Sequence, residues 1–263
     1  MSLAELDWDA SHGIATLTLN RPEVLNAIDV NLARALRDVV RTLPDRQGLR
    51  CVLLRGAGRA FVAGGDLAAF AADDFARTAE LAGEILDAMH EVLEIFARID
   101  APVLGVVQGV AAGAGLSLVA ACDLAIAAQG TRFITAYDRI GSSPDCGATY
   151  FLTRILGARR TAQLYLTGET LEADEALRLG LINRVVPAEQ LAEEGLNQAR
   201  KLAAGPTAAF GRFKRLTAAS LDRELPEQLA AERAVFLEGT ATGDFREGLT
   251  AFLHKRPARF TGT

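Results

Sequence analysis

The order of apolar and polar residues along the chain predicts strands that alternate with helices. Residues 14–19, 51–54 and 103–107 are predicted to be short strands, each followed by turn-forming residues. The last of these segments is apolar throughout, as in a strand that is buried on both faces. Residues 74–98 repeat apolar side chains at helical spacing, which predicts a long amphipathic helix. Alternation of the two patterns predicts an α/β fold.

The pattern changes after about residue 190, where no further strand is expected. Before that point we also expect a helix capped by Asp29, helices over 116–121, 146–156 and 172–179, and strands over 124–127 and 181–186. Beyond it, helices are separated at Gly205-Pro206 and at Pro226. We therefore expect a core over 1–195 and a helical region over 196–263 that packs on the body or on another subunit.

Composition and charge narrow the class of protein. Half of the residues are hydrophobic and 23% are charged, which is typical of a globular chain and excludes a disordered one. A net charge of −5 gives no indication of a nucleic-acid surface. The longest apolar run, Val110 to Cys122, is shorter than the ~20 residues of a membrane span. The N-terminus has no signal-peptide pattern, so we expect a cytoplasmic protein without membrane contact.

The motifs of several common chemistries are missing. Three scattered cysteines and three histidines form neither C-x-x-C nor H-E-x-x-H, so no metal site is expected, although aspartates could still bind magnesium. The sequence has no G-x-S-x-G and no G-K-[ST]. Residues 56–61 and 113–118 begin like a dinucleotide-binding fingerprint but lack its third glycine.

Two glycine-rich turns are the first candidate site. FVAGGDL (61–67) and QGVAAGAGLSL (108–118) each follow a strand, and the second enters a helix at about Gly113–Ala114. The first turn of a helix has unpaired N–H groups and a positive dipole end. Two such turns facing one point would form an oxyanion hole, in which each donor is worth about 3 kcal/mol. Tight packing turns are the alternative interpretation.

Five further segments carry a family resemblance together with these turns. They are LTLNRPEVLNA (17–27), ACDLAIAA (121–128), IGSSPDCGATYFLTRILG (140–157), LTGETLEADEALRLGLINRVV (166–186) and REGLTAFLHKRPARF (246–260). In this combination the chain resembles the crotonase superfamily, also called the enoyl-CoA hydratase/isomerase family. The resemblance implies a spiral of β-β-α units with a C-terminal helical trimerisation region. It also implies a coenzyme A thioester as substrate, no permanently bound cofactor, and a homotrimer or a hexamer made of two trimers.

The resemblance also implies roles for the glycine-rich turns. The family's two oxyanion donors correspond to the backbone amides of Gly65 and Ala114, which would bind the thioester oxygen and stabilise an enolate. The residues around the first donor are expected to border the substrate: Ala63, Gly64, Asp66 and Leu67. We expect Asp66 to shape its turn through side-chain hydrogen bonds.

Asp145 is the expected acid–base residue. The two glutamates of the hydratases correspond to Ser117 and Tyr137, neither of which is a carboxylate. Residues 143–150, SPDCGATY, instead resemble the P-D-x-G segment of the ring-epoxide and enoyl-CoA isomerase branch, whose single aspartate corresponds to Asp145. One carboxylate suffices for a 1,3-proton shift. Local sequence also allows Asp145 to be only the N-cap of the following helix.

Contacts with coenzyme A are expected on other segments. By resemblance, Lys255 lies near the nucleotide, Phe236 packs on its adenine, and Val24 and Leu25 flank its other side. A solvated charge pair with Arg256 is the alternative for Lys255.

Two further residues are expected near the acyl group. Tyr137 would line the acyl pocket or belong to the core, and His90 would be structural or line the pocket.

The sequence therefore predicts an isomerase that shifts a double bond, or opens a ring epoxide, in an acyl-CoA of fatty-acid or phenylacetate breakdown. A hydratase is the first alternative, and a non-catalytic acyl-CoA-binding subunit is the second.

Overall fold

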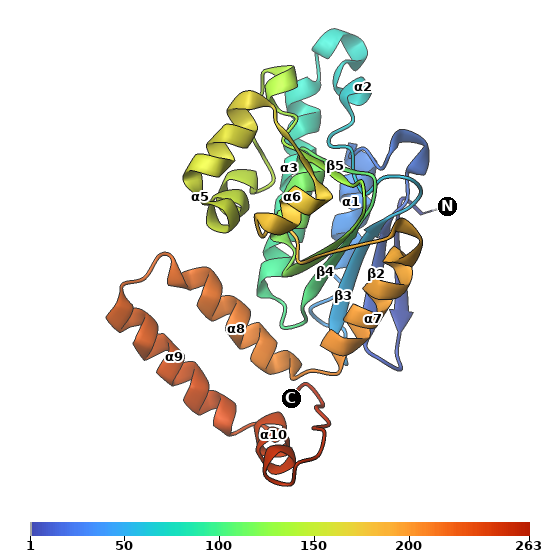
Figure 1. Cartoon of the computed structure of the whole chain (residues 1–263). Coiled ribbons are helices and arrows are strands. Elements are labelled where there is room, and N and C mark those ends of the chain that lie inside the picture. The colour runs from blue at the N-terminus through green and yellow to red at the C-terminus, as the bar shows by residue number, and fades with distance from the viewer. Residues whose placement is uncertain (1) are drawn as a thin grey trace.

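The computed structural model describes residues 2–263 and contains one main sheet with a smaller sheet beside it (Figure 1). The main sheet has the strand order β1-β2-β3-β4-β6-β9. Only the β1–β2 pair is antiparallel, and the other neighbours are parallel. These strands are Ala4–Asp9, Ile14–Leu19, Cys51–Gly56, Val103–Val107, Leu124–Ala128 and Arg184–Val186. The small sheet has the order β5-β7-β8, formed by Val110–Ala112, Arg132–Ile134 and Thr170–Glu172.

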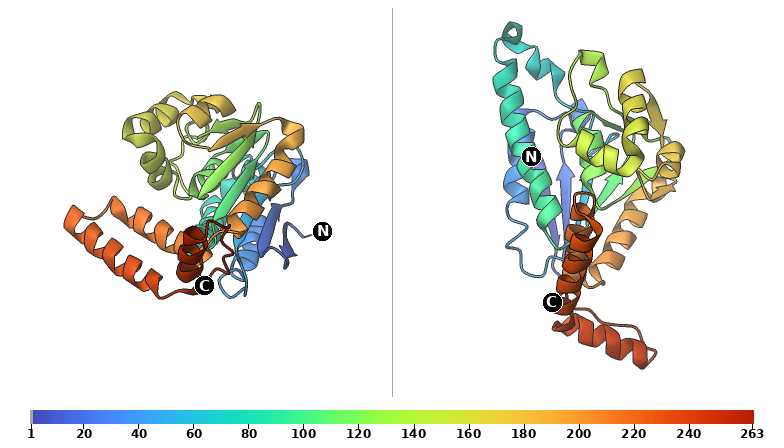
Figure 2. Two further views of the ribbon diagram at one scale, coloured as in Figure 1. Left: turned by 60° about the horizontal axis from the view of Figure 1, so that its bottom comes forward. Right: turned by 90° about the vertical axis from the view of Figure 1, so that its left-hand side faces the viewer.

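Helices cover both faces of the main sheet (Figures 1 and 2). α1 (Val30–Val40) and α3 (Thr78–Arg98) pack together on one face, and α7 (Leu191–Ala203) lies on the other. Strand β3 contributes side chains to the hydrophobic cores on both faces of the sheet. Val52 and Leu54 point to the α1–α3 side, whereas Cys51 and Leu53 point to the α7 side. Burial of both faces is the reason why this strand is apolar over four successive residues.

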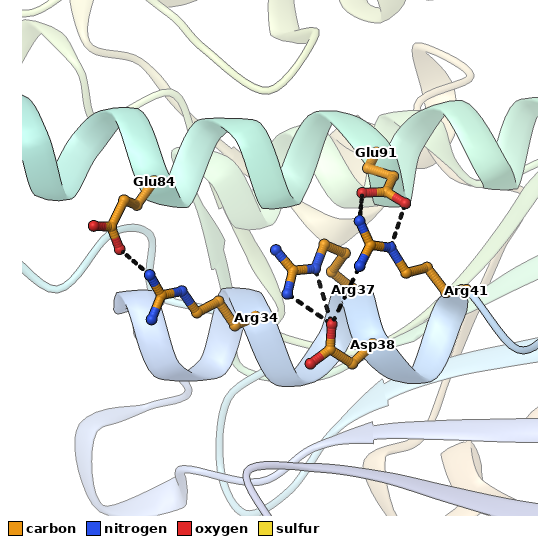
Figure 3. Close-up of polar contacts among 6 residues, drawn as sticks. All are labelled: Arg34, Arg37, Asp38, Arg41, Glu84 and Glu91. Atoms are coloured by element: carbon orange, nitrogen blue, oxygen red, sulfur yellow. Dashed lines mark hydrogen bonds and ion pairs between the residues drawn. The ribbon is translucent and has the colours of Figure 1, made fainter.

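Ion pairs join the outer surfaces of α1 and α3 (Figure 3). Arg34 lies 2.6 Å from Glu84, and Arg41 forms a two-pronged pair with Glu91. Since all four side chains reach solvent, these pairs add little to stability and mainly fix how the two helices lie along each other.

Four further helices connect the strands. They are α2 (Leu67–Phe70), α4 (Ala114–Ala121), α5 (Ala148–Thr167) and α6 (Ala173–Arg178), with the 3₁₀ helices η1 (Pro22–Val24), η2 (Ala72–Phe75), η3 (Asp138–Ile140) and η4 (Ala188–Gln190). The chain then forms α8 (Thr207–Ser220), α9 (Leu225–Thr240) and α10 (Gly243–Leu253). No helix among residues 2–263 is both long enough and apolar enough to cross a membrane.

The last three helices project from the body as an arm, coloured orange to red in Figure 2. Lys214 of α8 attaches the arm: its ammonium lies 2.8 Å from the Asp123 carboxylate and donates to the carbonyl oxygens of Phe96 and Ala101. The buried Arg50 guanidinium donates to the carbonyl oxygens of Ala203, Gly205 and Phe260, which ties the C-terminal segment to the body. Elsewhere the arm leaves large apolar side chains exposed.

Most predicted elements are present, with shifted ends. The long helix begins at Thr78 instead of residue 74, and the strand expected over 181–186 is reduced to β9. Gly157 has a non-helical conformation, but helical structure resumes directly after it and continues to Thr167. The boundary expected after residue 195 lies inside α7, a helix that packs on the main sheet.

Candidate functional site

The two glycine-rich turns lie side by side at one edge of the main sheet. The Val62 amide donates to the carbonyl oxygen of Val110 (3.2 Å), and the Ala112 amide donates to that of Val62 (2.9 Å). A Cβ atom added to Gly113 would lie 3.7 Å from the Gly64 Cα. Gly64 and Gly113 both have positive φ, at 102° and 50°, so glycine allows each of the two segments to turn where they approach closely.

Two backbone amides at these turns are free. Among residues 2–263, the Gly65 and Ala114 N–H groups donate no hydrogen bond to another group of the chain. Ala114 is the first residue of α4, where the helix dipole is positive. Both residues line the same cavity, so each amide is available to a polar group bound there.

The first turn is held by Asp66 and by a neighbouring segment. The Asp66 carboxylate accepts the Ala69 amide at the start of α2 and pairs with Arg21 at 3.2 Å, so it shapes the turn as expected. Arg21 also lies 3.3 Å from Asp29. The Ile28 amide donates to Gly64, and the Ile28 carbonyl accepts the Asp66 amide, which fixes Gly65 between them. Asp66 itself does not line the cavity.

Asp145 lies in the loop before α5 and lines the same cavity as Gly65 and Ala114. Its side chain does not cap α5: the N-cap residue is Gly147, which has no side-chain cap, and only the Asp145 backbone carbonyl accepts the Ala148 amide. The carboxylate instead accepts a 2.6 Å hydrogen bond from the Tyr137 hydroxyl. The alternative interpretation of Asp145 as a helix cap is therefore wrong.

The hydroxyl groups of Tyr137 and Ser117 lie close to Asp145. The Ser117 hydroxyl lies 3.5 Å from the Tyr137 oxygen, and it lies within hydrogen-bond distance of the carbonyl oxygens of Gly113 (3.3 Å) and Asp145 (3.2 Å). Burial, and after it the charge of Asp145, raises the pKa of Tyr137 far above its ordinary value of 10. Burial likewise raises the pKa of the Cys146 thiol, so this cysteine stays protonated beside the carboxylate.

The cavity has a volume of about 710 Å³ and a mainly apolar wall. Its large apolar side chains come from the loop after η1, from α2, α3 and η3: Ile28, Leu67, Phe70, Ile85, Leu86 and Ile140. Ala63 and Gly64 belong to the lining, and His90 of α3 contributes an exposed imidazole. Among the described residues that line the cavity, Asp145 is the only carboxylate. This wall suits an acyl group, and the two free amides and the Asp145 carboxylate belong to residues that line the same cavity.

Four residues that are expected to contact coenzyme A do not line this cavity. Val24 and Leu25 lie at the 3₁₀ turn after β2, where Leu25 adopts a left-handed conformation. Phe236 of α9 is 64% exposed and has its ring centroid 6.2 Å from that of Phe245. Lys255 is exposed just after α10. Within one chain, the candidate residues for coenzyme A are therefore divided between the body and the arm.

The side-chain contacts around Asp145 could not be predicted from the sequence. Ser117, Tyr137 and Asp145 lie on a helix, a turn and a loop, and no periodic spacing relates them. Only the fold shows that Tyr137 bonds Asp145 rather than serving simply as core or pocket lining. Among the side chains that the structure describes, no group of three or more histidine, cysteine, aspartate or glutamate residues is arranged to hold a metal ion.

The chain matches known proteins over nearly its whole length. The family model for enoyl-CoA hydratase/isomerase matches residues 9–263. A probable enoyl-CoA hydratase of Rhodobacter capsulatus is 39% identical over the full length of both chains. The 1,2-epoxyphenylacetyl-CoA isomerase of Escherichia coli is 37% identical, with 95% of each chain covered. The crystal structure of an enoyl-CoA hydratase from Mycobacterium smegmatis has a TM-score of 0.90 at 32% identity, with 99% of each chain covered. This likeness confirms the expected fold class.

Proposed function

The chain belongs to the enoyl-CoA hydratase/isomerase family, and on this premise we propose that it is an isomerase that moves a double bond, or opens a ring epoxide, in an acyl-CoA thioester. One observation carries the proposal: Asp145 is the only carboxylate among the described residues lining a cavity that also holds two free backbone amides. A 1,3-proton shift needs one acid–base group, whereas hydration needs one group to activate water and another to deliver a proton.

The two amides act on the thioester oxygen. The Gly65 and Ala114 N–H groups donate to this oxygen, and they donate most strongly when it becomes an enolate oxygen with a full negative charge. Neither amide has another acceptor in the described chain, so binding the oxygen breaks no existing hydrogen bond. The positive end of α4 adds to the stabilisation at Ala114.

Asp145 moves the proton. In a 3-enoyl thioester, its carboxylate takes a proton from C2, and the electron pair of that C–H bond becomes part of a dienolate. The resulting carboxylic acid returns the proton to C4, and the product has its double bond between C2 and C3. No water, oxidant or second base takes part. For a ring epoxide, the carboxylate would likewise first take a proton from C2, and the acid so formed would protonate the epoxide oxygen as its C–O bond breaks.

Hydration is the second candidate because the relative in Rhodobacter capsulatus is named a probable enoyl-CoA hydratase. A hydratase here would require Asp145 both to activate water and to protonate C2. A non-catalytic acyl-CoA-binding subunit is the third candidate, and it would use the amides and the apolar wall without a proton transfer.

Coenzyme A and a second copy of the chain belong to the same proposal. Coenzyme A would arrive as part of the substrate, with Lys255 near its phosphates, Phe236 near its adenine, and Val24 and Leu25 on the opposite side. Because these residues lie on the body and on the arm, a neighbouring subunit in a homotrimer or hexamer would bring them together. The exposed apolar surface of the arm supports self-association.

Incubation with 3-enoyl-CoA and 2-enoyl-CoA separates the three candidates. An isomerase gives a conjugated product of unchanged mass, a hydratase adds one water to 2-enoyl-CoA, and a binding subunit converts neither. Asp145→Asn is expected to lower turnover by about 10²–10⁴-fold, the usual contribution of a general acid–base group. Its circular dichroism and melting temperature should stay close to those of the wild type.

Asp45→Asn is the matched control, because Asp45 is exposed in the loop after α1. It should keep full activity. Near-normal turnover by Asp145→Asn would remove Asp145 from the mechanism.

A further inference from the structure

Tyr137 is placed to control how the Asp145 carboxylate is presented to the cavity. Its ring is 6% exposed, and its hydroxyl donates to Asp145 Oδ1 at 2.6 Å. Tyr137 belongs to the turn that leads into η3, whereas Asp145 belongs to the loop before α5. The hydrogen bond therefore joins two separate loop segments at the cavity wall.

The same group of hydroxyls reaches the helix that carries one of the free amides. Ser117 lies three residues after Ala114 in α4, is fully buried, and is 3.2 Å from the Asp145 carbonyl oxygen and 3.5 Å from the Tyr137 hydroxyl. Tyr137 and Ser117 together link the loop of Asp145 to α4. The acid–base group and the oxyanion donor are thus held in one connected unit.

The Tyr137 proton stays on the phenol. Burial comes first among the causes that raise the Tyr137 pKa, and the adjacent Asp145 charge and hydrogen bond act in the same direction. A phenol that keeps its proton can only donate to the carboxylate, so it occupies Oδ1. The Tyr137 hydroxyl thus leaves the other oxygen, Oδ2, open to a substrate carbon.

We infer that Tyr137 is a positioning residue: its phenol fixes the Asp145 carboxylate so that one oxygen, Oδ2, carries the proton from C2 to C4 of the substrate. The inference rests on the proposed isomerase function. Oδ2 accepts the proton from C2, the electron pair moves into the dienolate, and the same oxygen returns the proton to C4. The Tyr137 proton does not move during the reaction. A carboxylate that stays fixed beside the substrate should return the same proton that it removed.

The test compares Tyr137→Phe with the wild type on 3-enoyl-CoA that carries deuterium at C2. Loss of the hydroxyl frees the carboxylate to rotate away from the substrate, so the deuterium that it carries has more time to exchange with water. Because misplacement of a reacting group by 1 Å can cost about 10²-fold, we expect kcat to fall by about that factor. KM should change little, since Tyr137 does not bind the thioester oxygen. The fraction of deuterium retained at C4 should also fall.

Tyr150→Phe is the matched control, because Tyr150 lies on α5, is 43% exposed and stacks against Arg154 outside the cavity. It should keep the wild-type kcat, KM and deuterium retention. Wild-type kcat and retention in Tyr137→Phe would overturn the inference. A fall in kcat with unchanged retention, or together with a large loss of thermal stability, would also overturn it, because a merely structural role gives that result.

A second readout does not depend on isomerase activity. The tyrosinate absorbance of the wild type minus that of Tyr137→Phe reports ionisation of Tyr137 alone. In Asp145→Asn, measured against the Tyr137→Phe/Asp145→Asn double variant, Tyr137 should ionise at lower pH because the neighbouring negative charge is gone. An unchanged titration would show that the two groups do not interact, which contradicts the inference. If the wild type hydrates 2-enoyl-CoA and isomerises nothing, the proposed function fails whatever this titration shows.

Discussion

The body buries several of its phenylalanine side chains, whereas the arm leaves several phenylalanine side chains exposed. Phe61, Phe96 and Phe133 of the body are at most 1% exposed, because strands and helices of the same chain cover them. Phe213, Phe236 and Phe252 of the arm are 64–81% exposed. Both regions contain enough apolar residues to form a core. An apolar helix face therefore indicates that the helix will be buried, but it does not show whether the same chain or a second chain packs against that face.

The apolar surface of the arm is hollowed rather than flat. α8, α9 and α10 enclose a groove of about 710 Å³, whose wall includes Phe213, Phe236, Leu249 and Phe252. A contiguous exposed apolar surface of this kind is typical of protein–protein contact sites. The body is thus complete within one chain, whereas the arm has the surface on which the proposed self-association rests.

The largest expected effect comes from one substitution made in both regions. Phe96→Ala removes a buried ring of α3 and should lower the free energy of unfolding by about 3–5 kcal/mol. Phe252→Ala removes an 81% exposed ring of α10 and should change the stability of the single chain by at most about 0.5 kcal/mol. Its effect should appear instead as weaker association in sedimentation experiments.

Urea unfolding at several protein concentrations separates the two effects, because stability that comes from association depends on concentration. The alternative is an arm that does not associate with a second chain. Phe252→Ala would then leave the sedimentation of the protein unchanged.

The attachment of the arm to the body should give the next largest effect. Lys214→Met leaves the Asp123 carboxylate without its ion pair, in a site that is only partly open to solvent. We expect a loss of about 3 kcal/mol, the lower end of the range for breaking a buried pair. The double variant Lys214→Met/Asp123→Asn should recover part of this loss, and urea unfolding measures both. A double variant as unstable as the single one would argue against the ion pair as the cause.

This loss should depend on pH. Burial raises the pKa of Asp123 above its ordinary value of 3.8, and the Lys214 charge opposes that shift. Without Lys214, the folded state binds a proton more readily than the unfolded state does. The loss of stability should therefore shrink as the pH falls towards the Asp123 pKa and grow as the pH rises through it.

The smallest expected effect lies at the end of the arm. Hydrogen bonds from the Arg256 guanidinium, and then from the Arg259 amide, lower the pKa of Glu247 from 4.5 to about 2. A carboxylate with a lowered pKa stabilises the folded state above pH 4.5, and this contribution is lost as the pH falls from 4.5 to 2. In Glu247→Gln, melting temperature should fall less steeply with acid over that range. Equal slopes for the two proteins would show that the contact does not stabilise the fold.

Elements with long regular patterns could be predicted, and elements without them could not. α1, α3 and strands β2, β3 and β4 follow from apolar periodicity because each has a wide buried face. β5, β7 and β8 were missed, since strands of three residues are too short to show alternation. β1 was also missed, although its sequence AELDWD alternates apolar and polar residues and its Leu6 and Trp8 pack against the core beside the buried Ala4.

The candidate site likewise has one part that could be predicted from the sequence and one part that could not. Both glycine-rich turns were evident in the sequence because glycine is needed where two backbones approach closely. The hydrogen bond between Tyr137 and Asp145 was not, because each residue lies in an irregular segment and their contact depends on how two loops fold against each other.

The sequence by itself determined which backbone turns and which single carboxylate were available, because glycine, aspartate and apolar periodicity act through local conformation and burial. Only the tertiary structure decided that the Asp145 side chain meets Tyr137 instead of capping α5, and that the arm stands away from the core. Those outcomes depend on contacts between residues far apart in the chain, and the energy of such a contact is not encoded in either segment alone.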